Sequence, residues 1–167
     1  CEEGARKEGP CQESGREGMT PDFRSYLPGD AEACLALFDA NCPRFFASGE
    51  RADYAAYLDR VSSYRVCVTD GAISGAFGVA PGLPGRAHLN WILIDPASQG
   101  VGIGRAMMLA AMADASARGA AALDIAASQH SAPFFARFGA RELCHLPDGW
   151  GPGMHRIDME LAISPVG

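Results

Sequence analysis

The spacing of hydrophobic residues changes several times along the chain and predicts alternating blocks of strand and helix. Apolar residues alternate with polar ones, or run together, in seven strand-like stretches: 23–27, 64–70, 72–80, 87–94, 121–127, 140–146 and 155–161. Apolar spacing of three and four predicts helices at 31–40, at 51–61, from the glycines near 104 to 118, and at 131–138. The predicted order is β-α-α-β-β-β-α-β-α-β-β, which indicates one mixed α/β domain over residues 19–167.

Residues at the ends of these blocks support the assignments. Asp30 stands where a helix N-cap is expected, and Gly119 suits the position just after a helix. Asp114 and Arg118 are spaced to pair along one helix face. The stretch 147–153 is rich in Gly and Pro and predicts a loop between the last two strands.

Residues 1–18 differ in composition from the rest. They contain five Glu, no aromatic residue and no aliphatic residue larger than Ala5. Such a segment cannot bury enough apolar surface to offset the entropy of ordering, so a flexible tail or upstream extension is expected there. Met19 follows it and resembles a natural start.

Composition and charge narrow the class of protein. The chain has 167 residues, is 48% hydrophobic and carries a net charge of -6. This hydrophobic content suits one domain with a sizeable core, and the negative charge argues against nucleic-acid binding. An acidic protein is compatible with cationic substrates such as amines. No apolar run is long enough to span a membrane, so a cytoplasmic enzyme or binding protein is expected.

The six cysteines show no C-x-x-C pair and no zinc-finger spacing to histidine. We therefore expect reduced thiols and no metal site, with four cysteines serving as small apolar fillers in or near packed elements.

The stretch DPASQGVGIGRAMML, residues 95–109, contains the main chemical signal. Gly100, Gly102 and Gly104 stand at the start of a helix, where free N–H groups and the helix dipole favour an anion. A P-loop is excluded because no lysine follows, and a dinucleotide fingerprint fails because Arg105 and Met107 stand where glycine is required. An ordinary loop-to-helix turn is the alternative.

The order of elements and two motifs resemble the GNAT N-acetyltransferase superfamily over residues 22–162. Gln99-x-x-Gly102-x-Gly104 is similar to the family's Q/R-x-x-G-x-G/A motif, and SAPFFARFGA, residues 131–140, is similar to its later motif ending in F-Y-x-x-x-G-F. The resemblance implies a mixed, mostly antiparallel sheet flanked by helices, with a splayed central strand pair, 87–94 and 121–127. It also implies acetyl-CoA as cosubstrate.

The resemblance assigns the cofactor contacts as well. Backbone groups of Ile92, Leu93 and Ile94 are expected to pair with the pantetheine arm, and Ser128, Ser131 and Phe134 to flank the thioester. The diphosphate is expected to lie against the glycine motif, which comprises Gln99, Gly100, Val101, Gly102, Ile103, Gly104 and Arg105.

A general base is expected on the strand before the glycines. The family often has a carboxylate eleven residues before the Gln, and this chain has His88 there. On an alternating strand, His88, Asn90, Ile92 and Ile94 would share one side, and Leu89, Trp91 and Leu93 the other. His88 is therefore the candidate base, with Asn90 positioning substrate or water; an ordinary strand histidine is the alternative.

The general acid departs from the family pattern, because Phe135 occupies the position of the usual Tyr. Ser131, Ser128 or a water would then protonate the leaving thiolate, or the thiolate would leave without a proton in the field of the nearby helix start. The cysteines Cys67 and Cys144 lie on predicted strands, where burial disfavours a reactive thiolate, so direct attack by the acceptor in a ternary complex is expected.

The acceptor is the least defined partner. In this fold, loops 41–50 and 145–155 border the acceptor site, and Phe45, Phe46 and Trp150 would either contact the acceptor or close the ends of the core. They favour a small, partly apolar amine. An acetyl-CoA sensor without catalytic activity and a transferase of protein amino termini or lysines are the alternatives, and a homodimer is compatible with the family.

Overall fold

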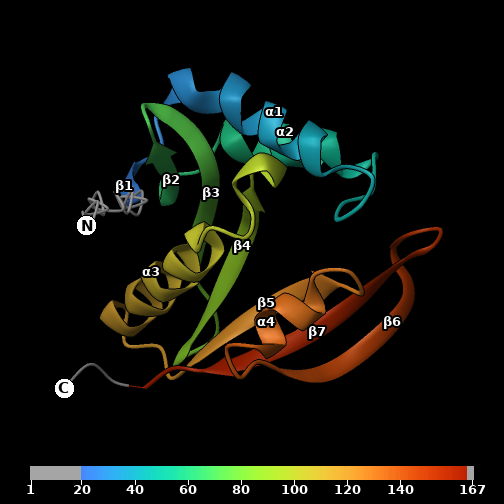
Figure 1. Cartoon of the computed structure of the whole chain (residues 1–167). Coiled ribbons are helices and arrows are strands. Elements are labelled where there is room, and N and C mark those ends of the chain that lie inside the picture. The colour runs from blue at the N-terminus through green and yellow to red at the C-terminus, as the bar shows by residue number, and fades with distance from the viewer. Residues whose placement is uncertain (1–19, 165–167) are drawn as a thin grey trace, which may run out of the picture.

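A seven-stranded sheet in the order β1-β2-β3-β4-β5-β7-β6 forms the centre of the molecule (Figure 1). The computed structural model describes residues 20–164. The strands are β1 (Asp22–Ser25), β2 (Tyr64–Thr69), β3 (Ala72–Pro81), β4 (Arg86–Ile94), β5 (Ala122–Ser128), β6 (Arg141–Gly151) and β7 (Met154–Ala162). Neighbouring strands pair antiparallel except β4 and β5, which are parallel.

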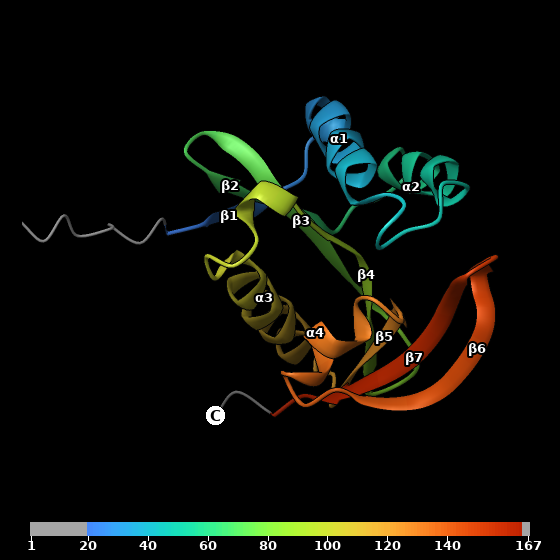
Figure 2. The same ribbon diagram turned by 45° about the vertical axis from the view of Figure 1, so that its right-hand side comes forward.

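Helices cover both faces of this sheet (Figures 1 and 2). The helices α1 (Ala31–Asn41) and α2 (Glu50–Leu58) lie on one face, and α3 (Ile103–Ala117) and α4 (Ala132–Ala136) lie on the other. Short 3-10 turns occupy Pro28–Asp30 and Pro96–Ser98. The order and kinds of the main elements are those that the hydrophobic spacing predicts, and the mixed α/β fold is confirmed.

Each face of the sheet has its own hydrophobic core. One core lies under α3 and α4, where Ile103, Met107, Ala111 and Ala115 repeat every four residues and are buried. The other lies under α1 and α2 and contains many aromatic side chains, including the fully buried Tyr54 and Tyr64. The sheet thus separates two cores, and residues that pack on each core line a different wall of the cleft described below.

The parallel pair β4 and β5 separates along its length. Their register runs only from Arg86 opposite Ala122 to Leu89 opposite Ile125. From Asn90 onward β4 pairs with β3 alone, while β5 stays paired with β7 as far as Ser128. The expected splay is therefore present, and it opens toward the start of α3.

Ion pairs link four strands at the closed end of the splay. Arg86 on β4 pairs with Asp124 on β5 and with Glu160 on β7, the latter at 2.7 Å. Arg141 on β6 also contacts Glu160, at 2.7 Å. Hydrogen bonds from Arg141 and Arg86 hold the pKa of the Glu160 carboxyl below its ordinary value.

A bulge in β4 reverses the side-chain alternation at Trp91. Its φ of +44° is unusual for a bulky residue. The fully buried Tyr64 donates a hydrogen bond of 2.6 Å from its hydroxyl to the Trp91 carbonyl, and the Tyr54 and Tyr64 hydroxyls lie 2.9 Å apart. These contacts hold the bulge from the side of α1 and α2.

The prediction of uninterrupted alternation along β4 was therefore wrong. Leu89 packs in the core under α3, and so do Ile92 and Ile94, whereas Trp91 and Leu93 pack under α1 and α2. The bulge adds one residue to β4 between Leu89 and Ile92. Side chains after the bulge therefore point to the opposite face of the sheet from the one that strict alternation predicts.

Two predicted local contacts are replaced by longer-range ones. Asp30 occupies the N-cap position of α1 but makes no side-chain cap; its carboxylate binds Arg24 and the backbone N–H of Leu27. Asp114 pairs with Arg65 on β2 at 3.0 Å rather than with Arg118. Gly119 follows α3 with a φ of +75°, as predicted.

The predicted loop 147–153 was also wrong, because β6 continues to Gly151. The register between β6 and β7 is irregular between Leu146 and Gly151, and Asp148 adopts a φ of +54°. The Asp148 carboxylate accepts from the N–H of Gly153 at 2.8 Å and so closes a tighter turn. An edge strand tolerates this irregularity because one side has no partner strand.

Four cysteines fall within the described residues, and all four are free thiols. Cys34 and Cys67 are buried and Cys42 is partly buried, but Cys144 on the edge strand is exposed, so it is not the packed filler that was expected. The predicted tail at 1–18 lies outside the described residues. Among the helices of residues 20–164, none is long and apolar enough to cross a membrane. In the same range, His, Cys, Asp and Glu form no group of three or more that could hold a metal ion.

We expect Tyr64→Phe to lower the free energy of unfolding by about 1–3 kcal/mol, because the Trp91 carbonyl and the Tyr54 hydroxyl lose a buried partner. Urea denaturation measures the change. Tyr26→Phe is the matched control, since the Tyr26 ring contacts Tyr64 while its hydroxyl makes no hydrogen bond within residues 20–164. Equal stability of the two variants would contradict a role for the Tyr64 hydroxyl at the bulge.

Candidate functional site

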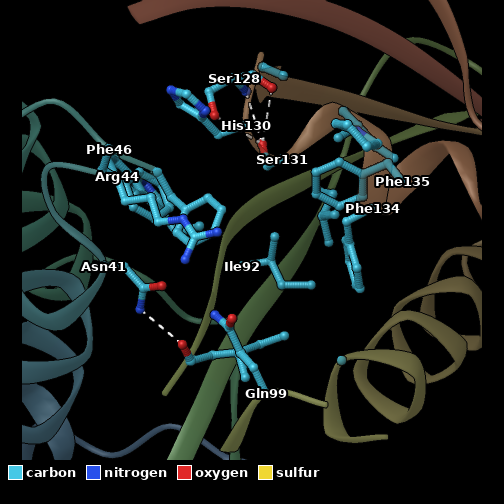
Figure 3. A pocket seen from close by; sticks show the side chains of 18 of the residues that line it. Asn41, Arg44, Phe46, Ile92, Gln99, Ser128, His130, Ser131, Phe134 and Phe135 are labelled. Carbon is cyan, nitrogen blue, oxygen red and sulfur yellow. Dashed lines mark hydrogen bonds between the residues drawn. The ribbon is translucent and has the colours of Figure 1, made fainter. Parts of the chain in front are cut away.

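A cleft of about 790 Å³ occupies the opening between β4 and β5. One wall consists of the open half of β4, the glycine segment before α3, and α4; the other consists of the α1–α2 loop, the start of α2 and the end of β6. Figure 3 shows labelled residues from both walls facing this space. The volume lies within the range of small-molecule sites.

The start of α3 and the glycines before it line the cleft. Gly100 and Gly102 have φ values of +81° and +88°, and a Cβ at either would meet open space. Gly102 is the N-cap and provides no side-chain cap. The N–H groups of Gly102, Gly104 and Arg105 make no hydrogen bond within the described part of the chain. Unpaired N–H groups and the positive end of the helix dipole together favour a phosphate or similar group.

Gly104 has a different role from its two neighbours. A Cβ there would lie 2.9 Å from Cδ1 of Ile94 and 3.1 Å from the Phe134 ring. Glycine at this position therefore lets α3 approach β4 and α4 closely, and the space next to it is filled by side chains.

Two arginines stand on the same side of the cleft as the glycines. Arg105 lies in the first turn of α3, and Arg137 follows α4 with its guanidinium 5.7 Å from the centre of the Phe134 ring. Phe134 also makes edge-on contacts with Phe135 and Phe138. This wall thus combines an aromatic surface with positive charge.

The opposite wall carries aromatic and charged groups from the α1–α2 loop. Phe46 stacks on Trp91 with ring centres 6.0 Å apart, and the Arg44 guanidinium lies 5.0 Å from the centre of the Phe45 ring. Glu50, in the first turn of α2, accepts a hydrogen bond of 2.7 Å from the Ala47 N–H. Burial raises the pKa of the Glu50 carboxyl above its ordinary value.

The end of β6 closes one side of the cleft. The Trp150 indole N–H donates to the Ala127 carbonyl on β5 at 3.0 Å. A Cβ at Gly151 would lie 3.7 Å from the Cβ of Ala47, so this strand end meets the α1–α2 loop. The two segments that the resemblance implied around the acceptor, 41–50 and 145–155, therefore meet at this side of the cleft.

Most of the predicted site residues line this one cleft. Those that do are Phe45, Phe46, Asn90, Ile92, Ile94, Gln99, Gly100, Gly102, Gly104, Arg105, Ser128, Ser131, Phe134 and Trp150. The Leu93 and Ile103 side chains are instead buried in the two cores, and the Val101 side chain is 65% exposed outside the cleft lining. Backbone contacts to a ligand at these three positions stay predictions.

His88 lies away from the other predicted residues. It belongs to the paired half of β4, opposite Asp124, and its Nδ1 is 3.8 Å from the Asp124 carboxylate. Its side chain is 49% exposed and is not among the residues that line the cleft. The geometry therefore gives His88 no direct access to a reacting group in the cleft.

Four ionisable lining residues were missed in the sequence: Arg44, Glu50, His130 and Arg137. Glu50 looks like an ordinary acidic residue in a first helical turn. Arg44 and His130 lie in loops, where spacing predicts no direction for a side chain. Arg137 belongs to the FFARFGA motif, so the motif could have indicated that it lies near the cofactor site.

Comparison with known proteins gives the family. Residues 32–140 match the acetyltransferase (GNAT) family. Because the match spans more than half of the chain, the protein belongs to the GNAT acetyltransferase family and is an acyltransferase. No curated protein matches the sequence significantly.

Solved structures show the same fold. A GNAT-family protein from Desulfovibrio desulfuricans is 23% identical, with a TM-score of 0.73 over 87% of this chain and 100% of that one. The ribosomal-protein-S18-alanine N-acetyltransferase of Escherichia coli is 20% identical, with a TM-score of 0.71 over 89% and 97%. A phosphinothricin acetyltransferase from Sinorhizobium meliloti, solved with acetyl-CoA, is 16% identical, with a TM-score of 0.72 over 87% and 90%.

We expect His88→Ala to leave kcat/KM for acetyl transfer within about twofold of wild type and its pH profile unchanged, because a general base must reach the reacting proton directly or through one water. Steady-state assays of thiol release across pH measure this. A loss of about a hundredfold, or a shifted acid limb, would show that His88 takes part in proton transfer after all.

Proposed function

We propose that the protein transfers an acetyl group from acetyl-CoA to the primary amine of a small molecule, by direct attack within a ternary complex. The observation that carries this proposal is the set of unpaired N–H groups at the start of α3, next to the unpaired half of β4. Together they provide a phosphate site beside an open strand edge in one cleft.

The residues on the α3 side fit coenzyme A. The N–H groups from Gly102 to Arg105 would bind the diphosphate, with positive charge added by Arg105 and Arg137. Beyond Leu89 the edge of β4 has no partner in β5 and would pair with the pantetheine amides. At Ile94 the carbonyl already accepts a hydrogen bond of 2.9 Å from Asn41 Nδ2, so Ile92 offers the freer backbone groups. Acetyl-CoA supplies the acetyl group as a thioester.

Glu50 is the residue best placed to accept the proton of the acceptor ammonium. It lines the cleft, and one carboxylate oxygen is held by the Ala47 N–H, which fixes the orientation of the other. A pKa raised by burial brings a carboxylate nearer to the working pH and strengthens it as a base. Asn90 lines the same space and would position the amine or a water.

The leaving sulfur needs a proton from a group other than a phenol, because Phe135 is buried at the position of the usual Tyr. The Ser128 and Ser131 hydroxyls lie 3.3 Å apart on the lining of the cleft, and Ser131 Oγ accepts from the Ser128 N–H at 3.0 Å. Ser131 would donate this proton directly or through water.

The size of the cleft favours a small acceptor over a protein chain. The contact between the end of β6 and the α1–α2 loop closes one side, and Phe45, Phe46 and Trp150 line the space. Since one cleft of about 790 Å³ has to hold both the acetyl end of the cofactor and the acceptor, little room is left for an extended polypeptide.

We expect Gly102→Ala to weaken coenzyme A binding by about tenfold or more, because a Cβ at a φ of +88° strains the backbone whose N–H groups would bind the diphosphate. Isothermal titration calorimetry with coenzyme A measures the affinity. Gly71→Ala, in the β2–β3 turn, is the matched control: its φ is +78°, and a Cβ there also meets open space. If wild type does not bind coenzyme A, or both variants bind it equally well, the proposed diphosphate site is wrong.

We expect Glu50→Gln to lower kcat/KM by about a hundredfold near neutral pH, because a neutral amide cannot accept the proton. In wild type the carboxylate is the active form, so activity falls as the pH drops through the Glu50 pKa, which burial places above the ordinary value of 4.5. The acid limb should disappear in Glu50→Gln. Glu32→Gln on the exposed face of α1 should keep the wild-type profile; an unchanged limb in Glu50→Gln would exclude Glu50 as the base.

A further inference from the structure

The charge of the cleft differs in sign from that of the chain. The chain carries a net charge of -6. Among Arg, Lys, Asp and Glu residues, the cleft is lined by Arg44, Arg105, Arg137 and Glu50, and these four side chains together carry a net charge of +2. Since the whole protein is acidic, this positive excess points to a negatively charged ligand.

The positive groups lie on both walls of the cleft. Arg105 and Arg137 lie on the α3 and α4 side with the proposed diphosphate site, whereas Arg44 lies on the α1–α2 loop across the cleft. Figure 3 shows the Arg44 side chain on the α1–α2 side, facing the space in front of Ile92. The charge of Arg44 is therefore left for the other substrate.

Arg44 also has no evident structural role. Within residues 20–164 no carboxylate lies within 4.0 Å of its guanidinium, although six other arginines form ion pairs there. The guanidinium carbon lies 5.0 Å from the centre of the Phe45 ring, and this contact leaves the N–H groups of the fork available. A guanidinium held on an aromatic surface with free donors is suited to bind a carboxylate through two hydrogen bonds.

We propose that the acceptor carries an acidic group close to its amine, in the manner of an amino acid, and that Arg44 binds this group while Glu50 faces the ammonium. The proposal rests on the acetyl transfer proposed above. Phe45, Phe46 and Trp150 line the remaining acceptor space and favour an apolar side chain on this amino acid.

Protons and electron pairs balance in this transfer. Glu50 takes one proton from the ammonium, and the neutral nitrogen forms a bond to the acetyl carbon. The carbon–sulfur bond breaks, and the sulfur leaves with its electron pair and receives a proton by way of Ser131. The nitrogen loses its second proton as the amide forms, and this proton replaces the one that Ser131 gave to the sulfur. Glu50 releases its proton to water, and the products are the N-acetyl amino acid and coenzyme A. The acidic group takes no part in bond making and stays on Arg44.

Paired acceptors test this inference on the whole protein. Phenylalanine, methionine and leucine are each compared with the corresponding carboxamide, in which the carboxylate alone is replaced, and thiol release from acetyl-CoA is measured. We expect wild type to prefer the free acids by about tenfold or more in kcat/KM, since a charge-assisted pair is lost with the carboxamide. Arg44→Ala should remove this preference by raising KM for the acids and leave kcat/KM for the carboxamides within about twofold. Arg60→Ala, in the turn after α2 and outside the cleft lining, controls for the loss of one positive charge and should keep the preference.

The outcomes separate this inference from the proposed function. If acetyl-CoA does not bind by calorimetry, both fail. If it binds, and simple amines or carboxamides are acetylated as well as the acids or better, the acidic acceptor is wrong while acetyl transfer stands. The acidic acceptor is also wrong if Arg44→Ala affects acids and carboxamides equally. If acetyl-CoA binds and no paired acceptor stimulates thiol release, the acidic acceptor is again wrong, and acetyl transfer then has to be shown with another amine.

Discussion

The four-residue register between β4 and β5 is the constraint on which the rest of the structure depends. Because the strands part after Leu89 and Ile125, β4 keeps β3 as its neighbour and β5 keeps β7, and an opening forms inside a continuous sheet. Backbone groups along the open half of β4 then lack a neighbouring strand in β5. An unpaired edge inside a protein is costly unless side chains or a ligand satisfy it.

Side chains satisfy part of that edge and leave the rest for a ligand. Asn41, buried at the end of α1, donates to the Ile94 carbonyl, and Tyr64 donates to the Trp91 carbonyl from the core behind. On the facing strand β5, the Trp150 indole N–H donates to the Ala127 carbonyl. These three side chains come from α1, β2 and β6, so distant parts of the chain jointly keep the two strands apart while the segment around Ile92 stays accessible.

The sequence predicted the order of elements well because apolar spacing reports which face each segment buries. It also predicted exposed N–H groups at the start of α3, because closely spaced glycines lie within a few neighbouring residues there, and the structure leaves the N–H groups of Gly102, Gly104 and Arg105 unpaired within residues 20–164. The anion that these groups would bind stays a prediction. The bulge at Trp91 was not predictable from local pattern, because a buried tyrosine far along the chain stabilises it. Because of this bulge, the prediction of which β4 side chains share a face was wrong. The candidate base was taken from the family position at His88, whereas the carboxylate that lines the cleft, Glu50, comes from another element.

Two other predictions were wrong because contacts between distant segments decide the structure there. Asp114 was expected to pair within α3, but Arg65 reaches it from β2, and helical spacing carries no information about a neighbouring strand. The irregular end of β6 depends on Asp148 accepting from Gly153 and on Trp150 reaching β5. Local composition predicted a loop there, because Gly and Pro are typical of turns. Composition carries no information about the hydrogen bonds to distant residues that hold this segment in the strand.

The division into two cores has an evolutionary consequence. The glycine segment and α4 rest on the core under α3, while Phe46 and Trp91 belong to the separate core under α1 and α2. Substitutions in the α1–α2 loop can therefore remodel one wall without repacking the other. Proteins with this architecture can therefore change the molecule that they acetylate through substitutions in the α1–α2 loop alone, while the segment at the start of α3 keeps its structure.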